Sequence, residues 1–353
     1  MTSDSKAPAR MRAVHLVEHG GPEALRMVEL PVPEPAEGEV RVKVAAISLN
    51  HLDVWVRRGL PGVEIPMPHV PGCDGTGVID ALGPGVGAGV AIGMPVLIEP
   101  GYTLVDGPEV LAGMDHLAPD YGIRGEHSSG LAAEYVCVQA RYVTPLPAGL
   151  DLIQTAAVPL VFVTAWGMLH HRAKIQSGET VLVLGAASGV GSAAIQIAKA
   201  HGCRVIATAG SEGKRALGRD LGADAVLNHR DEGWPKEVKA LTEGRGADVV
   251  FEHIGPATWD GAMRSLARCG RLVTCGGTTG PKVSITLPHL FMKNQSVLGS
   301  TMGPRSAFRE ILDGVASGLF RPVVHSVLPI EEIAEAHRML EGREVVGKLV
   351  LTF

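Results

Sequence analysis

The most constraining feature of this sequence is a short apolar run that leads into a glycine-rich turn and then into a helical pattern. Residues 180–185 read TVLVLG, residues 185–191 read GAASGVG, and the next stretch carries apolar side chains at spacings of three and four. The first is typical of a buried strand and the last of a helix that covers it. Small residues between them let the backbone and the positive end of the helix approach a phosphate. In this context the turn predicts a dinucleotide site.

The surrounding pattern predicts an α/β protein of two domains. From residue 11 to about 143, short β-rich runs are separated by Gly and Pro, and from residue 180 onwards strands alternate with helices five times. Such alternation predicts a parallel sheet covered on both faces. After residue 303 come a helix, a strand, a helix and a closing strand, GKLVLTF. A chain of 353 residues is long enough for these two domains.

Composition excludes several classes of function. Aromatic residues make up 4% of the chain, the net charge is -5, and there is no run of five basic residues, so nucleic acid is not an expected partner. The longest apolar stretch, residues 155–169, is interrupted by Pro159 and falls short of the roughly 20 residues of a membrane span. The polar residues 1–10 carry no hydrophobic signal region, and the five scattered cysteines form no CxxC pair. A loose N-terminal tail, reduced thiols and a cytoplasmic location are expected.

The end of the next strand predicts which dinucleotide binds. Residues 207–211 read ATAGS, without the Asp or Glu that would hold the ribose diol of NAD. Ser211, Lys214 and Arg215 follow instead, and these residue types suit a 2'-phosphate. NADPH is therefore expected in preference to NADH.

Four motifs together carry a family resemblance. They are Asn50-His51-Leu52-Asp53, PGCDGTG at 71–77, the glycine-rich turn, and GKLVL at 347–351. With them the chain resembles the medium-chain dehydrogenase/reductase superfamily. The resemblance implies a GroES-like β-rich domain from residues 1–152 and 303–353, with 1–10 as the loose tail, and a Rossmann domain with a doubly wound parallel sheet from residues 153–302.

The resemblance also implies that catalytic zinc is absent. Zinc-dependent members carry Cys, His and Cys where this chain has Asn50, Cys73 and Leu160, although Asp74 resembles their secondary carboxylate. One thiol and one carboxylate do not make the three protein ligands of a catalytic zinc site. No metal ligand set is therefore assigned, and Cys73 is expected to pack as a small buried residue.

A second metal is missing from a lobe at residues 101–126. The four Cys positions that hold a structural zinc in zinc-dependent members are Leu104, Gly107, Val110 and Ala118 here. The flanks of the lobe remain, so its order is expected to depend on apolar contacts of Leu104, Val110 and Leu117.

The strand end that contains Asn50 resembles the zinc-independent quinone oxidoreductase and enoyl reductase branch. That branch has an acidic residue, an aromatic and an Arg where this chain has Asp53, Trp55 and Arg57, although the aromatic is usually Tyr. Hydride addition to a carbon conjugated to a carbonyl spreads the charge, so a few hydrogen-bond donors suffice without a metal. The expected activity is NADPH-dependent reduction of an activated C=C bond or a quinone. Asn50, Trp55 and Asp74 are the catalytic candidates, and the proton donor is left open.

The same resemblance assigns a cofactor-binding set in both domains. Its members are His51, Thr164, Gly185, Ala187, Ser188, Gly189, Val190, Gly191, Ser211, Lys214, Arg215, His229, Gly276 and Lys348. His127 and His253 stand at strand ends, where each is either a proton source or an ordinary hydrogen-bonded histidine. Asp53 and Asp74 are carboxylates that either steer ligands or fix the local backbone.

Two alternatives stay open at this point. One is a metal-dependent alcohol dehydrogenase that uses a rearranged set of Cys73, Asp74, His51 and water. The other is a catalytically idle NADPH-binding protein. In every case the partner is a small molecule, and residues 283–300 resemble the sheet edge through which family members form homodimers.

Overall fold

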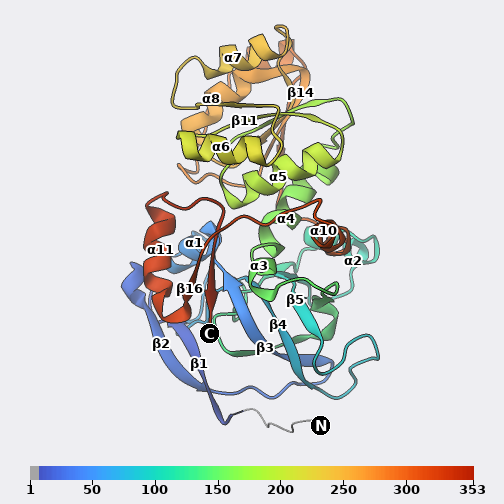
Figure 1. Ribbon diagram of the computed structural model, residues 1–353, viewed down its shortest axis with the longest axis vertical. Helices are drawn as coiled ribbons and strands as arrows, with labels where there is room; N and C mark the ends of the chain where they lie inside the picture. Colours follow the sequence, from blue (N-terminus) through green and yellow to red (C-terminus); the bar gives the residue numbers. More distant parts are fainter. Residues whose placement is uncertain (1–7) are drawn as a thin grey trace. The chain divides into compact units, whose positions relative to one another are not determined.

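The computed structural model describes residues 8–353, which form two compact units (Figure 1). Unit 1 comprises residues 8–160 and Val324–Phe353, and unit 2 comprises Val161–Val323. These divisions fall later in the chain than the expected 152/153 and 302/303. The reason is packing inside unit 2, where the rings of Phe162 and Phe320 lie 5.8 Å apart and the Gln196 side chain hydrogen-bonds the backbone of Arg321.

Unit 1 is built on a seven-stranded sheet in which β17, the last strand of the chain, lies between β16 and β3. The order is β16-β17-β3-β4-β5-β9, and β8 pairs with β3. β17 runs antiparallel to β3, with Val350 opposite Ser48. The strands are β3 (Glu39–Ser48), β4 (Asp74–Leu82), β5 (Pro95–Ile98), β8 (Tyr135–Gln139), β9 (Val143–Pro145), β16 (Val324–Pro329) and β17 (Lys348–Thr352). This unit also contains a separate hairpin, β1 (Arg10–Leu16) and β2 (Leu25–Pro31), and a two-stranded sheet of β6 (Gly101–Tyr102) and β7 (Gly122–Ile123). Its helices are α1 (His51–Arg58), α2 (Pro108–Leu111), α3 (Leu152–Thr155) and α11 (Ile333–Glu341).

Unit 2 contains the parallel sheet that the alternating pattern predicts, so the two-domain α/β fold class is confirmed. Its order is β12-β11-β10-β13-β14-β15, and every pairing is parallel. The strands are β10 (Thr180–Val183), β11 (Arg204–Thr208), β12 (Ala225–Leu227), β13 (Ala247–Glu252), β14 (Leu266–Thr274) and β15 (Ser296–Gly299). The helices are α4 (Pro159–Trp166), which begins in unit 1, α5 (Gly189–Ala200), α6 (Glu212–Asp220), α7 (Trp234–Leu241), α8 (Pro256–Ser265), α9 (Leu287–Met292) and α10 (Ala307–Ala316).

The order of the strands reverses at β10, which places helices on both faces of the sheet. β11 and β12 follow on one side of β10, whereas β13 to β15 follow on the other. Figure 1 shows α5 and α6 on one side of β11 and α7 and α8 on the other, and Trp234 of α7 shares a buried core with Trp259 of α8. Ligands of such sheets bind outside the carboxyl ends of the strands at this reversal.

Two segments differ from the sequence-based expectation. The run TWDGAMRSLARCG reads as one helix, but α8 ends at Ser265 and β14 begins at Leu266. Leu266 pairs with Ala247 of β13 and is fully buried, so sheet pairing outweighs helical preference here. The run VSITL at 283–287 forms no strand, whereas the later SVLG forms β15.

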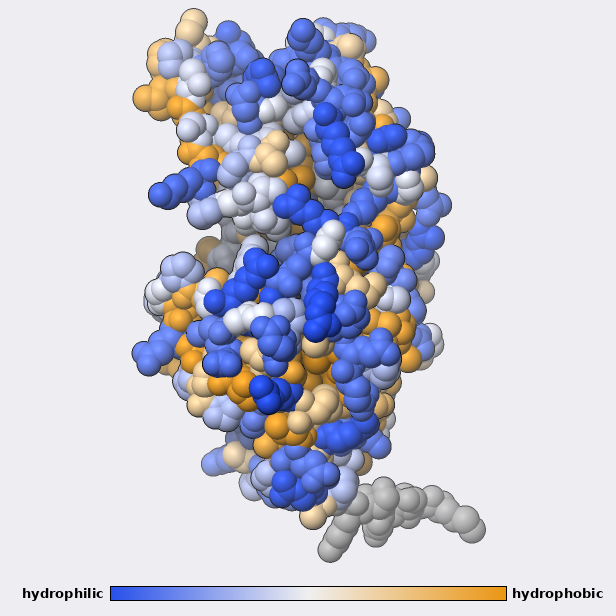
Figure 2. All heavy atoms as spheres, turned by 90° about the vertical axis from the view of Figure 1, so that its left-hand side faces the viewer, coloured by the Kyte–Doolittle hydropathy of each residue, from blue (hydrophilic) through white to orange (hydrophobic). Residues whose placement is uncertain are grey.

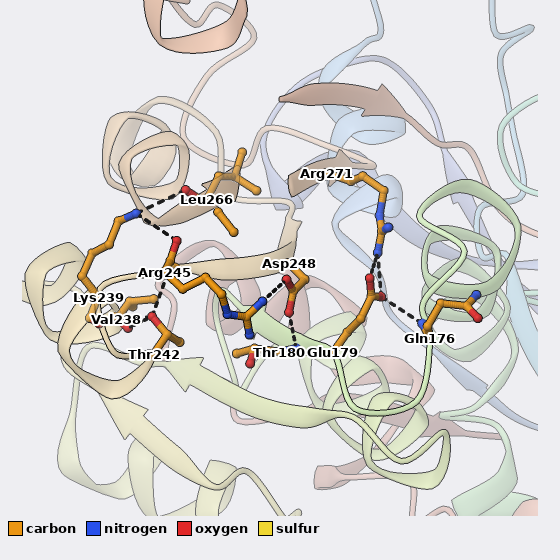
Figure 3. Close-up of polar contacts among 12 residues, drawn as sticks. Gln176, Glu179, Thr180, Val238, Lys239, Thr242, Arg245, Asp248, Leu266 and Arg271 are labelled. Carbon is orange, nitrogen blue, oxygen red and sulfur yellow. Dashed lines mark hydrogen bonds and ion pairs between the residues drawn. The ribbon is translucent and has the colours of Figure 1, made fainter. Parts of the chain in front are cut away.

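Charged side chains join the amino ends of β10, β13 and β14 (Figure 3). Both carboxylate oxygens of Glu179 accept hydrogen bonds from Arg271 Nη2, at 2.7 and 2.6 Å. Asp248 accepts from the backbone N–H of Thr180 at 2.8 Å and from Arg245 Nη1 at 2.5 Å. These contacts hold the amino-terminal parts of the three strands to one another.

The lobe at residues 101–126 is held together differently from the expectation. Leu104 is 75% exposed and Leu117 is 49% exposed, so apolar contacts of these residues do not order it. Tyr142 Oη instead lies 2.9 Å from the backbone N–H of Thr103 and 2.8 Å from its carbonyl oxygen, and the Arg124 guanidinium lies 5.3 Å from the Tyr102 ring centre. Aromatic and polar contacts take the place of the expected apolar ones.

No helix within residues 8–353 is long and apolar enough to cross a membrane. On the face shown in Figure 2, hydrophobic side chains are interspersed with hydrophilic ones.

A buried histidine predicts how stability depends on pH. His337 of α11 is fully buried, and neither ring nitrogen has a hydrogen-bond partner within residues 8–353. Burial, assisted by the Arg57 charge, lowers the pKa of His337 to about 3. The unfolded chain takes up this proton near pH 6.5, whereas the folded chain does not, so stability falls as the pH drops from 6.5 towards 3. In urea titrations, His337→Leu should remove about 2 kcal/mol of the loss of stability between pH 7 and pH 5.

The matched control for this prediction is the exposed His325 of β16. His325→Leu should leave the pH dependence of unfolding as in the wild type. Parallel pH profiles for wild type and His337→Leu would contradict the assignment.

Candidate active site

A buried polar cluster in unit 1 forms where β3 ends and α1 begins. We define it as Asn50, Asp53, Cys73, Asp74 and Lys348, all of them no more than 6% exposed. Asn50 follows the end of β3 in an extended conformation, and its backbone N–H donates to Asp53 Oδ2 at 2.7 Å. This bond fixes the start of α1 and leaves the Asn50 amide directed at the rest of the cluster.

The Asn50 amide is fully hydrogen-bonded. Its Nδ2 donates to Asp74 Oδ2 at 2.8 Å and to Cys73 Sγ at 3.2 Å. Its Oδ1 accepts from Lys348 Nζ. The sequence resemblance names both Asn50 and Asp74 as catalytic candidates, and the structure places them in contact. It assigns Lys348 to the cofactor and does not indicate the contact between Lys348 and Asn50.

Asp74 is the most heavily bonded member of the cluster. Its Oδ2 also accepts from Lys348 Nζ at 3.1 Å and from Ser48 Oγ at 3.2 Å, and its Oδ1 accepts from the backbone N–H of Leu160 at 2.8 Å. A buried carboxylate needs a countercharge and hydrogen-bond donors. Lys348 supplies the countercharge, and the Asn50 amide, the Ser48 hydroxyl and the backbone N–H of Leu160 supply hydrogen-bond donors.

Burial shifts the protonation of two further members. Desolvation raises the pKa of Asp53 to about 7, with the Lys348 charge opposing and the Asp74 charge adding to the shift. Desolvation, together with Asp53 and Asp74, raises the pKa of the Cys73 thiol well above its ordinary value. Cys73 is therefore protonated near neutral pH and does not act as a nucleophile there.

These donors do not fit a catalytic zinc ion. Such a site needs three protein ligands, with cysteine bound as thiolate. Here the positions that would need to supply ligands hold an amide, one thiol and Leu160, which contributes only its backbone, and the oxygens Asn50 Oδ1 and Asp74 Oδ2 accept from Lys348. Within residues 8–353 no three His, Cys, Asp or Glu side chains are grouped so as to hold a metal.

Two other candidates of unit 1 lie beside the cluster on α1. His51 is exposed and Trp55 is half-buried, and their ring centres lie 6.4 Å apart. His127, at the edge of the lobe, lies 3.2 Å through Nδ1 from the backbone N–H of Ile123, which makes it a hydrogen-bonded surface histidine.

The glycine-rich turn of unit 2 has the geometry of a phosphate cradle. Ser188 begins α5, and its Oγ accepts from the backbone N–H of Gly191 at 2.9 Å. Gly185 has a φ of +71°, and a Cβ on Gly191 would lie 2.2 Å from the Gly185 carbonyl oxygen. A side chain at either position would deform the turn, whereas glycine leaves the backbone N–H groups open to a pyrophosphate. The turn fits a dinucleotide on these grounds.

His253 contacts the residues at both ends of the stretch that leads into α5, Leu184 and Ser188. Its Nε2 lies 2.9 Å from the Leu184 carbonyl oxygen, to which it donates, and 3.2 Å from Ser188 Oγ. Burial lowers its pKa to about 4, so the ring is neutral at pH 7. Of the two roles open to His253 from the sequence, the structure favours the hydrogen-bonded one.

The end of β11 carries the residues expected near the adenosine half. Ser211 begins α6 and caps it through the backbone N–H of Lys214, at 3.5 Å. Arg215 is paired with Glu212 of the same helix at 2.7 Å. His229 Nδ1 lies 3.1 Å from Thr208 Oγ1, so its ring is fixed against the end of β11.

Arg230 is a residue that the sequence reasoning missed. A Cβ on Gly210 would lie 2.8 Å from Arg230 Nε and 3.1 Å from His229 Nε2. Arg230 is exposed, and its side chain lies against the turn that leads from β11 into α6. Its position in the sequence could have identified it, because it directly follows the candidate His229 and because the end of β11 has no acidic residue that would oppose a 2'-phosphate.

The remaining cofactor candidates also lie in unit 2. The Thr164 hydroxyl of α4 is buried and donates to Met302 Sδ at 3.7 Å. Gly276 follows the carboxyl end of β14, where its carbonyl oxygen accepts from Thr274 Oγ1 at 3.2 Å. Ala187, Gly189 and Val190 belong to the turn itself.

Comparison with known proteins gives matches over nearly the whole chain. The family model described as "Alcohol dehydrogenase GroES-like domain" matches residues 36–148, and that described as "Zinc-binding dehydrogenase" matches residues 189–317. Quinone oxidoreductase from Homo sapiens is 30% identical over an alignment of 351 residues that covers 97% of this chain and 97% of that one.

Two solved structures resemble this one closely. One is described as NAD-dependent alcohol dehydrogenase, with 47% identity and a TM-score of 0.94 over 97% of this chain and 100% of that chain. The other is described as the 2-octenoyl-CoA carboxylase reductase CinF in complex with NADP and 2-octenoyl-CoA, with 29% identity and a TM-score of 0.87 over 99% of this chain and 88% of that chain.

Proposed function

Because this chain belongs to the medium-chain dehydrogenase/reductase superfamily and is an NAD(P)H-dependent oxidoreductase, we propose that it reduces an activated C=C bond or a quinone with NADPH and without zinc. The observation that carries the proposal is the hydrogen bonding of the unit 1 cluster. The oxygens that a metal would need as ligands, Asn50 Oδ1 and Asp74 Oδ2, accept hydrogen bonds from the Lys348 ammonium, and Asp74 Oδ2 also accepts from the Asn50 amide. The named activities of the quinone oxidoreductase relative and of CinF support the same chemistry.

The residues of unit 2 that would hold NADPH are those of the cradle and of the β11 end. The turn from Gly185 to Gly191 offers backbone N–H groups to the pyrophosphate, while Lys214 and Arg230 offer positive charge to the 2'-phosphate. When bound, the nicotinamide would supply the hydride.

The residues of unit 1 would stabilise the charge that hydride transfer creates. Hydride addition to an enone leaves negative charge on the carbonyl oxygen, and a preorganised donor stabilises it. In the proposed mechanism Asn50 Nδ2 is this donor, because its present acceptor Cys73 Sγ is a weak one that a charged oxygen can replace. Asp74 and Lys348 keep the amide in place, and no role in the transfer is assigned to Trp55 beyond its place on α1.

The deciding experiment follows NADPH oxidation optically, with EDTA-treated protein of measured metal content, against a panel of enones, enoyl thioesters and quinones. Turnover without metal supports the proposal. Tight NADPH binding without turnover on any acceptor would instead support a catalytically idle binding protein.

A metal-dependent alcohol dehydrogenase is the second candidate, since the neighbour described as NAD-dependent alcohol dehydrogenase is 47% identical to this chain. Its test is NAD⁺ reduction with a panel of alcohols, before and after addition of zinc. Activity that appears only with zinc would overturn the reductase proposal.

Cofactor preference gives a testable prediction at the end of β11. Lys214→Ala and Arg230→Ala should each raise KM for NADPH about tenfold, because each removes a charged contact to the 2'-phosphate. KM for NADH should stay unchanged. Arg219→Ala is the control, since Arg219 lies on the same helix and pairs with Glu212. Equal changes for both dinucleotides would place these side chains elsewhere than at the 2'-phosphate.

We also propose a homodimer formed through β15, which is the edge strand of the unit 2 sheet. The preceding segment exposes large apolar side chains: Val283, Ile285, Leu287, Phe291 and Met292. An edge strand with an apolar flank is suited to pairing with a second copy. Sedimentation velocity tests this assembly.

A further inference from the structure

We propose that the Lys348 ammonium is the resident cation of the unit 1 cluster: it neutralises Asp74 and fixes which end of the Asn50 amide donates. In this way it supplies the positive charge that a metal ion supplies in zinc-dependent dehydrogenases. Lys348 is thus a positioning residue for the reaction and acts through Asn50. This inference deepens the proposed function and rests on it.

Lys348 fixes the direction of the hydrogen bonds that Asn50 makes. An ammonium only donates, so the Asn50 atom that contacts Lys348 Nζ must be the carbonyl oxygen Oδ1. The Nδ2 group is then forced towards Asp74 Oδ2 and Cys73 Sγ. Without Lys348, Oδ1 loses its donor and Asp74 Oδ2 is the remaining charged group that orients the amide, so the Nδ2 donor is less well fixed for the charge that develops on a substrate oxygen.

Lys348 also sets the charge balance of the cluster. Asp74 is fully buried, and Lys348 is the positively charged side chain that contacts it, at 3.1 Å. The two charges cancel. The other carboxylate of the cluster, Asp53, is used locally, because its Oδ2 accepts from the backbone N–H of Asn50 at 2.7 Å.

The contacts of Lys348 differ from those expected of the cofactor-binding residue that the sequence resemblance implies. Both bonds that the structure gives to Lys348 Nζ go to other members of the cluster, and the side chain is 4% exposed. A residue whose charge is already balanced by a buried carboxylate adds little attraction for a pyrophosphate. The two roles therefore predict different kinetic defects.

The main test compares Lys348→Met and Lys348→Arg with the wild type, using an acceptor that the wild type reduces. Lys348→Met should lower kcat at saturating NADPH about 100-fold, as expected for loss of an oriented donor, and leave the NADPH dissociation constant within about threefold. Lys348→Arg keeps the charge and should recover part of kcat. Lys43→Met is the matched control, because Lys43 is exposed on β3 of the same sheet.

Two results would overturn the inference. One is unchanged kcat in Lys348→Met. The other is a rise of tenfold or more in the NADPH dissociation constant with kcat preserved, which would return Lys348 to the cofactor site.

A second pair of variants covers the case in which Lys348→Met does not fold. Asp74→Asn and Asp74→Asn/Lys348→Met differ only in the ammonium, and the double variant buries no unpaired charge. The double variant should have at least tenfold lower kcat than the single one. Equal kcat values in the two would overturn the inference.

An activity-free measurement distinguishes failure of this inference from failure of the proposed function. The side-chain amide hydrogens of Asn50, assigned in NMR spectra by their loss in Asn50→Asp, should exchange slowly with solvent in the wild type and faster in Lys348→Met. Unchanged exchange would contradict the positioning role, whatever the activity. Absence of wild-type turnover with every acceptor would instead contradict the proposed function, and the exchange result would still test the role of Lys348.

Discussion

Gly191→Ala should raise the NADPH dissociation constant about 100-fold, or about 2.7 kcal/mol, while the protein stays folded. The new methyl group would lie 2.2 Å from the Gly185 carbonyl oxygen and 2.8 Å from Ser188 Oγ. Real Cβ atoms do not approach a backbone oxygen so closely, so the first turn of α5 must move away. The N–H groups that would face the pyrophosphate move with it. Titration of the cofactor fluorescence measures the effect.

Gly233→Ala is the control for this substitution. Gly233 lies before α7 in the same unit, and a Cβ there would meet no atom within 4 Å. This variant should bind NADPH as the wild type does. If Gly191→Ala also bound within threefold of the wild type, the turn would not be the phosphate site.

Asp74→Ala should lower the free energy of unfolding by about 3–5 kcal/mol, because it leaves the Lys348 ammonium buried without its countercharge. It also leaves the backbone N–H of Leu160 and the Ser48 hydroxyl without their acceptor. The loss should be seen in urea unfolding followed by circular dichroism at pH 7.

The matched control is an ion pair on the surface. Asp220 pairs with Arg321 while both side chains are about 60% exposed, at 61% and 59%. Asp220→Ala should change stability by no more than about 1 kcal/mol, since exposed ion pairs contribute little. Similar losses in both variants would mean that the buried charge of Lys348 is not compensated by Asp74.

Local patterns in the sequence predicted much of unit 2. The run TVLVLG, the turn that follows and the helix after it are adjacent in the chain, so periodicity and small residues were enough to place β10, the cradle and α5. The end of α8 could not be read in this way, because Leu266 joins β14 through its pairing with Ala247.

The unit 1 cluster lay beyond such local reasoning. Asn50 and Lys348 are 298 positions apart, and their contact exists only because β17 pairs with β3. The resemblance identified Asn50 and Asp74 but not the bonds between them. The prediction for the lobe at residues 101–126 was wrong for a related reason. Leu104 is mostly exposed, and contacts of Tyr142 and Arg124 hold the lobe instead. Neither residue is one of the four positions that correspond to the zinc-binding cysteines.

The central place of β17 in the unit 1 sheet has a consequence for how the chain acquires its structure during synthesis. β3, β4 and β8 are made early, and β8 covers the first half of β3, but the strand that pairs with the second half, β17, follows the whole of unit 2 in the chain. Unit 2 is continuous and can fold as soon as it leaves the ribosome, whereas the first sheet must wait with an open edge. Asp74 meets its ammonium only when β17 arrives. The nascent chain therefore has a complete unit 2 before the unit 1 cluster is complete.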